Sequence, residues 1–251
     1  MNASEIRKQL TRGLSSLGLE AGDTVLVHSS LRSLGDFSCK AEIVTDSILN
    51  CIGANGTLLV PALSYETVNK VNNLFDVKRT PSCVGGMSEF FRTTKGVLRS
   101  VHPTHSVCGF GPLAETLLQS HIQCNTPCGK NSPYQKLKEH GGKILFLGCG
   151  LRPNTSMHAV EELSEPPYLF GDYVRYRVIL ENGDNRYMTV LRHNFKGVLQ
   201  RYERISGIVT NRGLVFGNVF NAECHLLDAA TMWKEAHKVL LKDPLFFVDQ
   251  K

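Results

Sequence analysis

The chain has 251 residues, of which 42% are hydrophobic and 20% charged, as is typical of a folded protein with a sizeable buried core. No segment approaches the roughly 18 consecutive apolar residues of a membrane span. The first ten residues also lack the apolar centre of a secretory signal. We therefore expect one domain over residues 1–251, located in the cytoplasm and without a membrane partner.

The charge and the cysteines indicate which classes of ligand the chain binds. The net charge is +5, and the basic residues are dispersed rather than gathered in a run. This pattern favours a phosphorylated small molecule over nucleic acid. The eight cysteines are scattered, and the nearest metal-like spacing, Cys124 and Cys128 with His121 and His140, lacks a second cysteine pair. We expect reduced thiols and no metal.

The first elements alternate between helix and strand. Apolar residues at helical spacing predict an amphipathic helix over residues 4–17. A short β-branched run at 23–28 predicts a strand, which a polar loop follows. A helix over 39–52 and an apolar strand over 56–62 come next. This alternation indicates an α/β domain with a largely parallel sheet at its centre.

The middle of the chain is less regular. Residues 64–81 are polar and have no clear period, which predicts an irregular segment of the kind that often carries function. Short helices are expected over 85–92 and 112–120. Residues 143–148 form the most convincing buried strand in the sequence.

The pattern changes after residue 167. Segments 173–180 and 187–191 alternate between polar and apolar residues, and Asn182-Gly183 lies between them as a hairpin signal. A helix over about 227–241 ends the chain. Antiparallel strands are thus predicted to follow the parallel core.

The loop after the first strand is a candidate phosphate site. Residues 29–33, Ser-Ser-Leu-Arg-Ser, offer small hydroxyl groups and backbone N–H groups. A serine-rich turn that caps the next helix explains the same residues. Residues 99–106 likewise suit either a binding segment or a loop stiffened by proline.

His158 is the candidate base. It follows the buried strand at 143–148, where the carboxyl edge of a parallel sheet is expected, and Glu161 comes three residues later. A histidine can accept a proton near neutral pH, and a carboxylate can orient it. The alternative is a helix start capped by Asn154 or Thr155, with His158 merely packed beside it.

Seven blocks of sequence, in order and covering most of the chain, resemble the aminoglycoside 3-N-acetyltransferase family. They are Val-His-Ser-Ser-Leu-Arg-Ser-Leu-Gly at 27–35, Gly-Thr-Leu-Leu-Val-Pro at 56–61, Gly-Gly-Met-Ser-Glu-Phe-Phe-Arg at 85–92, Arg-Ser-Val-His-Pro-Thr-His-Ser-Val at 99–107, Gly-Lys-Asn-Ser-Pro at 129–133, Gly-Gly-Lys-Ile-Leu-Phe-Leu-Gly at 141–148 and Asn-Thr-x-x-His-x-x-Glu at 154–161. Each block alone is weak. Their common order carries the resemblance.

The resemblance implies a three-layer α/β/α fold with a mainly parallel central sheet and later antiparallel strands. It also implies an acetyl-CoA-dependent N-acetyltransferase, with acetyl-CoA as co-substrate and a small-molecule amine as acceptor. Both a monomer and a homodimer are compatible with the sequence. The expected cofactor contacts are Ser29, Ser30, Leu31, Arg32, Ser100, Ser106, Val107 and Thr155. Thr155 would donate a hydrogen bond to the oxyanion or to the departing thiolate, unless it is only a helix cap.

His158 matches the catalytic histidine of the family, and transfer is expected to be direct, through a ternary complex. The orienting carboxylate is left open among Glu203, Glu223 and Glu161, with a slight preference for Glu203. A covalent route through Cys108 or Cys149 is a minor alternative. The rival functions are a non-catalytic CoA- or sugar-binding protein and a thioester hydrolase that uses His158 and Cys149.

The acceptor is expected to contact residues 64–81, through Tyr65, Glu66 and Asp76. A polycationic aminoglycoside needs an acidic site, whereas this segment and the whole chain carry a basic excess. An anionic acceptor, such as an amino sugar on a nucleotide, is therefore slightly preferred. Both acceptors are retained.

Overall fold

The computed structural model describes residues 1–35, 40–210 and 212–251. Its centre is a seven-stranded sheet. The strand order is β10 (Leu214–Val219), β11 (Ala222–Asp228), β6 (Lys143–Leu147), β1 (Thr24–Ser29), β2 (Thr57–Pro61), β5 (Val107–Phe110) and β4 (Leu98–Arg99). β1 lies parallel to both β2 and β6, and the strands on either side of this trio pair antiparallel. The predicted parallel core is thus confirmed, and it consists of the three central strands.

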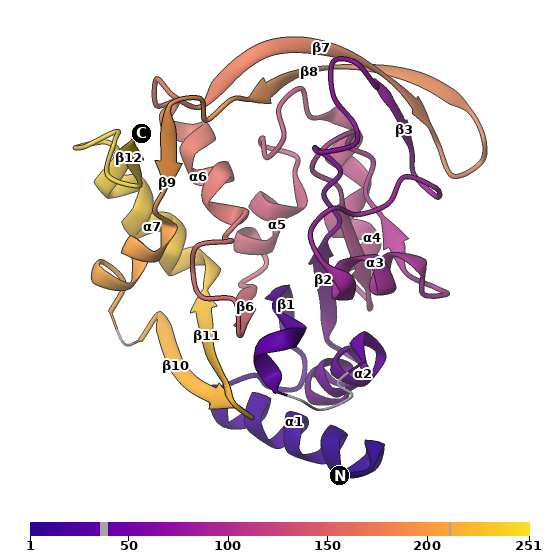
Figure 1. Ribbon diagram of the computed structural model, residues 1–251, viewed down its shortest axis with the longest axis vertical. Helices are drawn as coiled ribbons and strands as arrows, with labels where there is room; N and C mark the ends of the chain where they lie inside the picture. Colours follow the sequence, from indigo (N-terminus) through magenta and orange to yellow (C-terminus); the bar gives the residue numbers. More distant parts are fainter. Residues whose placement is uncertain (36–39, 211) are drawn as a thin grey trace.

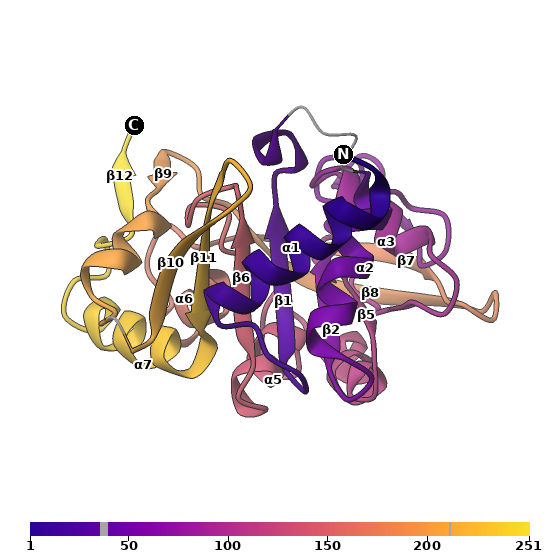
Figure 2. The ribbon, with the colours of Figure 1, turned by 90° about the horizontal axis from the view of Figure 1, so that it is seen from below.

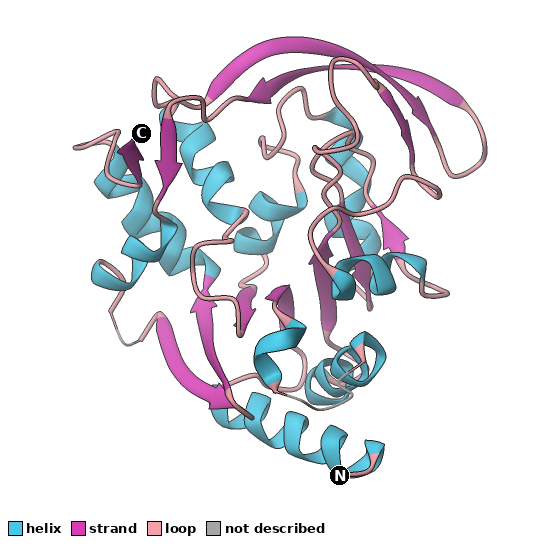
Figure 3. Cartoon of the chain, viewed as in Figure 1, coloured by secondary structure: helices cyan, strands magenta, loops and turns pink. Residues whose placement is uncertain are grey.

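Helices cover both faces of this sheet (Figures 2 and 3). On one face lie α1 (Ala3–Leu17), α2 (Ala41–Ile52) and α3 (Gly86–Thr93), and on the other lie α4 (Ala114–Leu118), α5 (Pro133–Glu139), α6 (Ser156–Ser164) and α7 (Ala229–Leu240). Successive residues of β1 serve the two layers, because side chains alternate along a strand: Val25 and Val27 pack in the first, Leu26 in the second. The expected three-layer α/β/α arrangement is confirmed.

Local capping chemistry sets the helix boundaries. At the start of α1, the side chain of Asn2 accepts a bond from the N–H of Glu5, whose carboxylate accepts one from the N–H of Asn2. The final helix begins at Ala229 rather than near 227, because Asp228 accepts a bond from the N–H of Thr231 as its N-cap. The predicted helix over 112–120 is divided between α4 and a 3₁₀ helix at Gln119–Gln123.

A second sheet arches over the top of the view in Figure 1. It contains β3 (Leu74–Asp76), β7 (Phe170–Ile179) and β8 (Asn185–His193). The predicted hairpin is confirmed, and Gly183 has φ 89° in its turn, a conformation that suits glycine. Residues 64–81 contain more order than expected, since β3 pairs with β7 and Phe75 is fully buried beneath the arch.

Seven of the described strands are not predicted by the sequence analysis, namely β3, β4 and β5, placed above, and four others. The hairpin of β10 and β11 extends the main sheet beside β6, while β9 (Val198–Gln200) pairs with β12 (Val248–Gln250) near the C-terminus. Another 3₁₀ helix, at Tyr202–Gly207, lies between β9 and β10. Within the described ranges, no helix is long and apolar enough to cross a membrane.

Candidate active site

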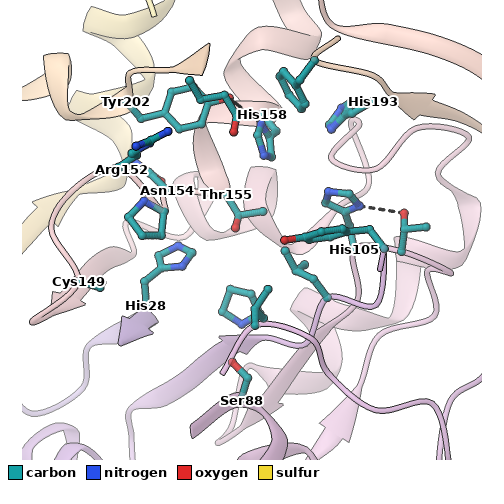
Figure 4. Close-up of a pocket in the computed structure, with 18 of the residues that line it drawn as sticks. His28, Ser88, His105, Cys149, Arg152, Asn154, Thr155, His158, His193 and Tyr202 are labelled. Atoms are coloured by element: carbon teal, nitrogen blue, oxygen red, sulfur yellow. Dashed lines mark hydrogen bonds between the residues drawn. The ribbon is translucent and has the colours of Figure 1, made fainter. Parts of the chain in front are cut away.

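A cavity of about 570 Å³ opens where β1 and β6 end (Figure 4). Because these strands are parallel, with Ser29 beside Leu147, their carboxyl ends reach the same edge of the sheet. Such edges are the usual binding places of open α/β sheets. Polar residues that line the cavity are His28, Ser29, Tyr65, Ser88, Thr104, His105, Cys149, Arg152, Asn154, Thr155, His158, Arg192, His193, Asn194, Gln200 and Tyr202.

A glycine allows the chain to turn from β6 into the cavity wall. Gly148 has φ 68°, and a Cβ placed there would lie 2.1 Å from Oγ of Ser33. The hydroxyl of Ser33 lies 2.7 Å from the carbonyl oxygens of both Ser30 and Gly148. The loops after β1 and β6 are thereby held together. The chain then continues through Cys149 and Arg152 to the start of α6.

His158 lies near the start of α6, and its ring nitrogen Nδ1 is hydrogen-bonded to two side chains. Its Nδ1 is 3.2 Å from Oε2 of Glu161 and 2.8 Å from the hydroxyl of Tyr202. Glu161 is on the same face of the helix because it is three residues away. Tyr202, which begins the 3₁₀ helix at 202–207, approaches from a distant part of the sequence.

The partners of Glu161 determine which nitrogen of His158 carries hydrogen. Glu161 is fully buried and accepts bonds of 2.7 Å from the hydroxyls of Tyr168 and Tyr202. Since Tyr202 donates its hydrogen to Glu161, its oxygen accepts from Nδ1–H of His158. In the neutral ring this leaves Nε2 with a free lone pair.

The predicted orienting role of Glu203 is not supported by its position. Glu203 forms an ion pair of 3.2 Å with Arg201, and its side chain is 40% exposed. Glu223 is 74% exposed and lies beside His225. Of the three carboxylates left open by the sequence, Glu161 is the one that contacts His158, because the helical spacing brings the two side chains together.

The predicted cofactor loop contributes less to the cavity than expected. Ser29 lines it, but the N–H of Ser30 binds the carbonyl of Leu147 at 2.9 Å and is not available to a phosphate. Leu31 packs against the core, while Arg32 is exposed and outside the cavity lining. Thr155 does line the cavity, and its side chain makes no capping bond.

The other expected cofactor residues, Ser100, Ser106 and Val107, are buried away from the cavity. The hydroxyl of Ser100 accepts from the N–H of Val107 and bonds to His121, and that of Ser106 binds the carbonyl of Ala62. Their polar groups are therefore used within the fold. In the same segment, Thr104 and His105 line the cavity instead.

Of the three expected acceptor contacts, Tyr65 lines the cavity. Glu66 is exposed and lies outside the cavity lining. Asp76 accepts bonds of 2.9 Å from the N–H groups of Lys78 and Arg79, so it stabilises a turn. The cations of the lining are Arg152 and Arg192, and no carboxylate occurs among the described residues that line it.

Several cavity residues were missed by the sequence analysis. The sequence does not predict His105, His193 or Tyr202 as site residues. His28, stacked on Phe146, has its pKa lowered to about 3 by burial and then by the charge of His158. Nothing in the local pattern of these residues separates them from packed core side chains, because their grouping arises from the topology.

The cysteines near the site are poor nucleophiles. Cys149 lines the cavity, but burial raises its pKa to about 12. Burial also raises the pKa of Cys108 to about 12, and that residue lies within β5. Both thiols are therefore protonated near neutral pH, which argues against the covalent route.

The comparisons with known proteins agree with this fold. Residues 26–241 match the family described as aminoglycoside 3-N-acetyltransferase. The chain is 28% identical over 249 residues to aminoglycoside N(3)-acetyltransferase III of Acinetobacter baumannii, covering 89% of this chain and 87% of that protein.

Two solved structures have the same fold. A variant of aminoglycoside acetyltransferase AAC(3)-IVa in complex with a gentamicin has a TM-score of 0.83 at 25% identity, over 96% of this chain and 90% of that one. AAC-IIIb in a binary complex with CoASH has a TM-score of 0.80 at 26% identity, over 94% and 96%. With most of its length matched, the chain is an acyltransferase and belongs to the aminoglycoside 3-N-acetyltransferase family.

Proposed function

We propose that one domain over residues 1–251 transfers an acetyl group directly from acetyl-CoA to an amino group of a small amino-sugar-containing molecule, with His158 as general base. The observation that carries this proposal is the position of His158. Its Nδ1 is held by Glu161 and Tyr202 at the wall of a cavity that the imidazole ring also lines. A base needs such orientation, with its other nitrogen free.

In the proposed reaction, the proton that leaves the amine passes through His158 to the thiolate of CoA. The amine nitrogen attacks the thioester carbonyl carbon while Nε2 of His158 takes the proton from that nitrogen. The C–S bond then breaks, and the thiolate of CoA leaves and receives the proton from the imidazolium. Glu161 stabilises the transient positive charge, because it lies against Nδ1 at 3.2 Å.

The start of α6 supplies the groups that suit the developing oxyanion. Thr155 lines the cavity with its hydroxyl free of any capping bond, and Asn154 lies beside it. A helix N-terminus also carries a partial positive charge. These features support Thr155 as a donor to the oxyanion or to the departing thiolate.

Acetyl-CoA is proposed as the co-substrate because a related enzyme, AAC-IIIb, has a structure with CoASH. In this chain, Arg152 and Arg192 are the cations of the cavity lining, and they suit the phosphates of CoA. The seven described cysteines are free thiols, which supports the cytoplasm as the location.

The lining favours an anionic or neutral acceptor over a polycation. Its cations have no carboxylate to balance them among the described residues, whereas an aminoglycoside needs acidic partners. We therefore propose that an anionic amino sugar is acetylated with a higher kcat/KM than any aminoglycoside. Added salt should weaken its binding through screening.

A panel of amines tests the proposal. Thiol release from acetyl-CoA is measured with aminoglycosides, nucleotide-linked amino sugars and neutral amino sugars, and the acetylated product is identified by mass spectrometry. Amine-dependent release is the expected result. Release without any amine would show a thioester hydrolase, and no release in the presence of bound CoA would show a binding protein. Efficient acetylation of aminoglycosides alone would overturn the proposed acceptor.

A further inference from the structure

Three histidines from separate segments meet at one wall of the cavity. His105 lies between β4 and β5, His158 lies on α6, and His193 ends β8. One nitrogen from each ring lies within 4.8 Å of the other two. Figure 4 shows the three rings grouped on the same side of the cavity, away from His28. The group arises from tertiary structure, because no two of its members are neighbours in sequence.

One nitrogen of each ring is hydrogen-bonded to an oxygen atom. Nδ1 of His105 is 2.9 Å from the hydroxyl of Thr104, and Nε2 of His193 is 2.7 Å from Oε1 of Glu162. Nδ1 of His158 bonds to Glu161 and Tyr202, as described above. Metal-binding histidines are commonly oriented in this way by a carboxylate or another oxygen.

The second ring nitrogen of His193, Nδ1, has no hydrogen-bond partner among the described residues. When Glu162 is ionised its oxygens only accept, so Nε2 of His193 donates to Oε1 and Nδ1 carries the lone pair. This Nδ1 is buried, and the side chain is 4% exposed. A buried polar atom without a partner destabilises the fold, because it has lost its hydrogen bonds to water. It therefore points to a ligand.

We propose that His105, His158 and His193 form a binding site for a divalent transition metal of the zinc class, with its fourth coordination position open to the cavity. Three imidazole nitrogens suit zinc and its neighbours, whereas calcium and magnesium require oxygen. Zinc–nitrogen bonds of about 2.0–2.1 Å place tetrahedral ligands about 3.4 Å apart. The present separations, up to 4.8 Å, are longer than this, so metal binding requires the three rings to move toward one another.

The metal site goes beyond the proposed function and shares His158 with it. A bound ion would engage Nε2 of His158, the same lone pair that takes the proton from the amine. The two uses exclude each other, so the metal-free form is the acetyltransferase and the ion is a reversible inhibitor. This inference also revises the expectation that the chain binds no metal.

Cobalt absorption tests the site directly. Full-length protein is treated with a chelator, freed of it and titrated with Co²⁺ near neutral pH, and the visible absorption of tetrahedral cobalt is recorded. One Co²⁺ per chain with intense absorption, displaced by one Zn²⁺, is expected. A weak absorption without defined stoichiometry would overturn the proposal.

Two variants and a matched control locate the ligands. His193→Ala should weaken Co²⁺ binding by more than about 10-fold, since it removes one of three ligands. Glu162→Gln should weaken it by about 10–100-fold through loss of orientation. His140→Ala is the control, because His140 is exposed and bonds to the carbonyl of Lys136 in its own helix. Unchanged affinity in His193→Ala, with folding verified by circular dichroism, would refute the site.

The cobalt titration separates this inference from the proposed function, since it needs neither acetyl-CoA nor an amine. An inactive protein that binds Co²⁺ would refute the acetyltransferase mechanism alone. An active protein that binds none would refute the metal site alone. For active protein, Zn²⁺ should suppress acetyl transfer and a chelator should restore it.

Discussion

The ends of β1 and β6 lie side by side, yet the chain uses them differently. Both strands are buried and parallel, and each continues into a polar segment. After β1, the N–H of Ser30 binds Leu147, and the hydroxyl of Ser33 binds Ser30 and Gly148. After β6, the chain presents Thr155 and His158 to the cavity.

This difference shows that polarity at a strand end does not by itself make a binding site. Backbone and hydroxyl groups that already have partners are not available to a ligand, because breaking those bonds carries a cost. β1 is followed by a short 3₁₀ helix at Leu31–Leu34, whereas the segment after β6 leads into the α-helix α6, near whose start Thr155 and His158 line the cavity. We expect substitutions after β6 to change catalysis, and those in the loop after Ser29 to change stability.

The largest effect is expected at His158. His158→Ala should lower kcat by roughly 100-fold or more, the usual scale of general-base catalysis, while the affinity for acetyl-CoA stays nearly unchanged. Steady-state kinetics gives the first quantity and calorimetry with CoA the second. The exposed His140→Ala is the control. Full turnover in His158→Ala would remove this residue from the mechanism.

The next effect concerns His28 in β1 and the pH dependence of stability. The pKa of His28 is lowered to about 3, while its ordinary value is 6.5. Below pH 6.5 the unfolded chain binds a proton that the folded chain does not bind until about pH 3. The free energy of unfolding therefore falls with decreasing pH, by about 1.4 kcal/mol per pH unit from this group.

His28→Gln removes this contribution. Between pH 6.5 and pH 5, its free energy of unfolding should fall by about 2 kcal/mol less than that of the natural protein, measured by urea denaturation. The remaining loss reflects other buried histidines such as His121, whose pKa is lowered to about 4 by burial. His140→Gln should match the natural protein. If the free energy of unfolding of His28→Gln depended on pH as steeply as that of the natural protein, the lowered pKa of His28 would be contradicted.

A smaller effect on catalysis is expected from substitution of Glu161, the carboxylate that contacts His158. Glu161→Gln should lower kcat by about 10-fold or more, because the amide stabilises the imidazolium less than a carboxylate does. Glu203→Gln is the matched control and should retain full activity, since Glu203 pairs with Arg201 away from His158. Loss of activity in Glu203→Gln, with full activity in Glu161→Gln, would show that Glu203 orients His158. Tyr202→Phe adds a third measurement, of the hydroxyl that bridges the two groups.

The sequence was a good guide where a feature depends on local chemistry. Apolar spacing predicts α1, Asn182-Gly183 predicts the β7–β8 turn, and the position of His158 after β6 predicts its place at the cavity. Prediction from the sequence was less successful where the hydrogen-bond partners of a residue are distant in sequence. Ser100 and Ser106 look like binding residues until their bonds to His121 and Ala62 are seen.

The same reason explains the residues that were missed. His105 and His193 are 88 positions apart by their numbers and meet only because β8 returns across the cavity. β10 and β11 were missed because their pairing with each other and with β6 depends on tertiary context rather than on a strong alternating pattern. A single sequence indicates which side chains are chemically able to act, and the topology decides which of them meet.

The smallest effect tests the loop after β1 with two serines four residues apart. Ser33→Ala should lower the free energy of unfolding by about 1 kcal/mol, because the hydroxyl of Ser33 links the carbonyls of Ser30 and Gly148. It should leave the KM for acetyl-CoA unchanged, since Ser33 is outside the cavity lining. Ser29→Ala should show the opposite pattern, with stability within about 0.5 kcal/mol of the natural protein and a mild rise in KM. If Ser33→Ala raised KM without loss of stability, the loop after β1 would be a cofactor site after all, and the contrast between the two strand ends would fail.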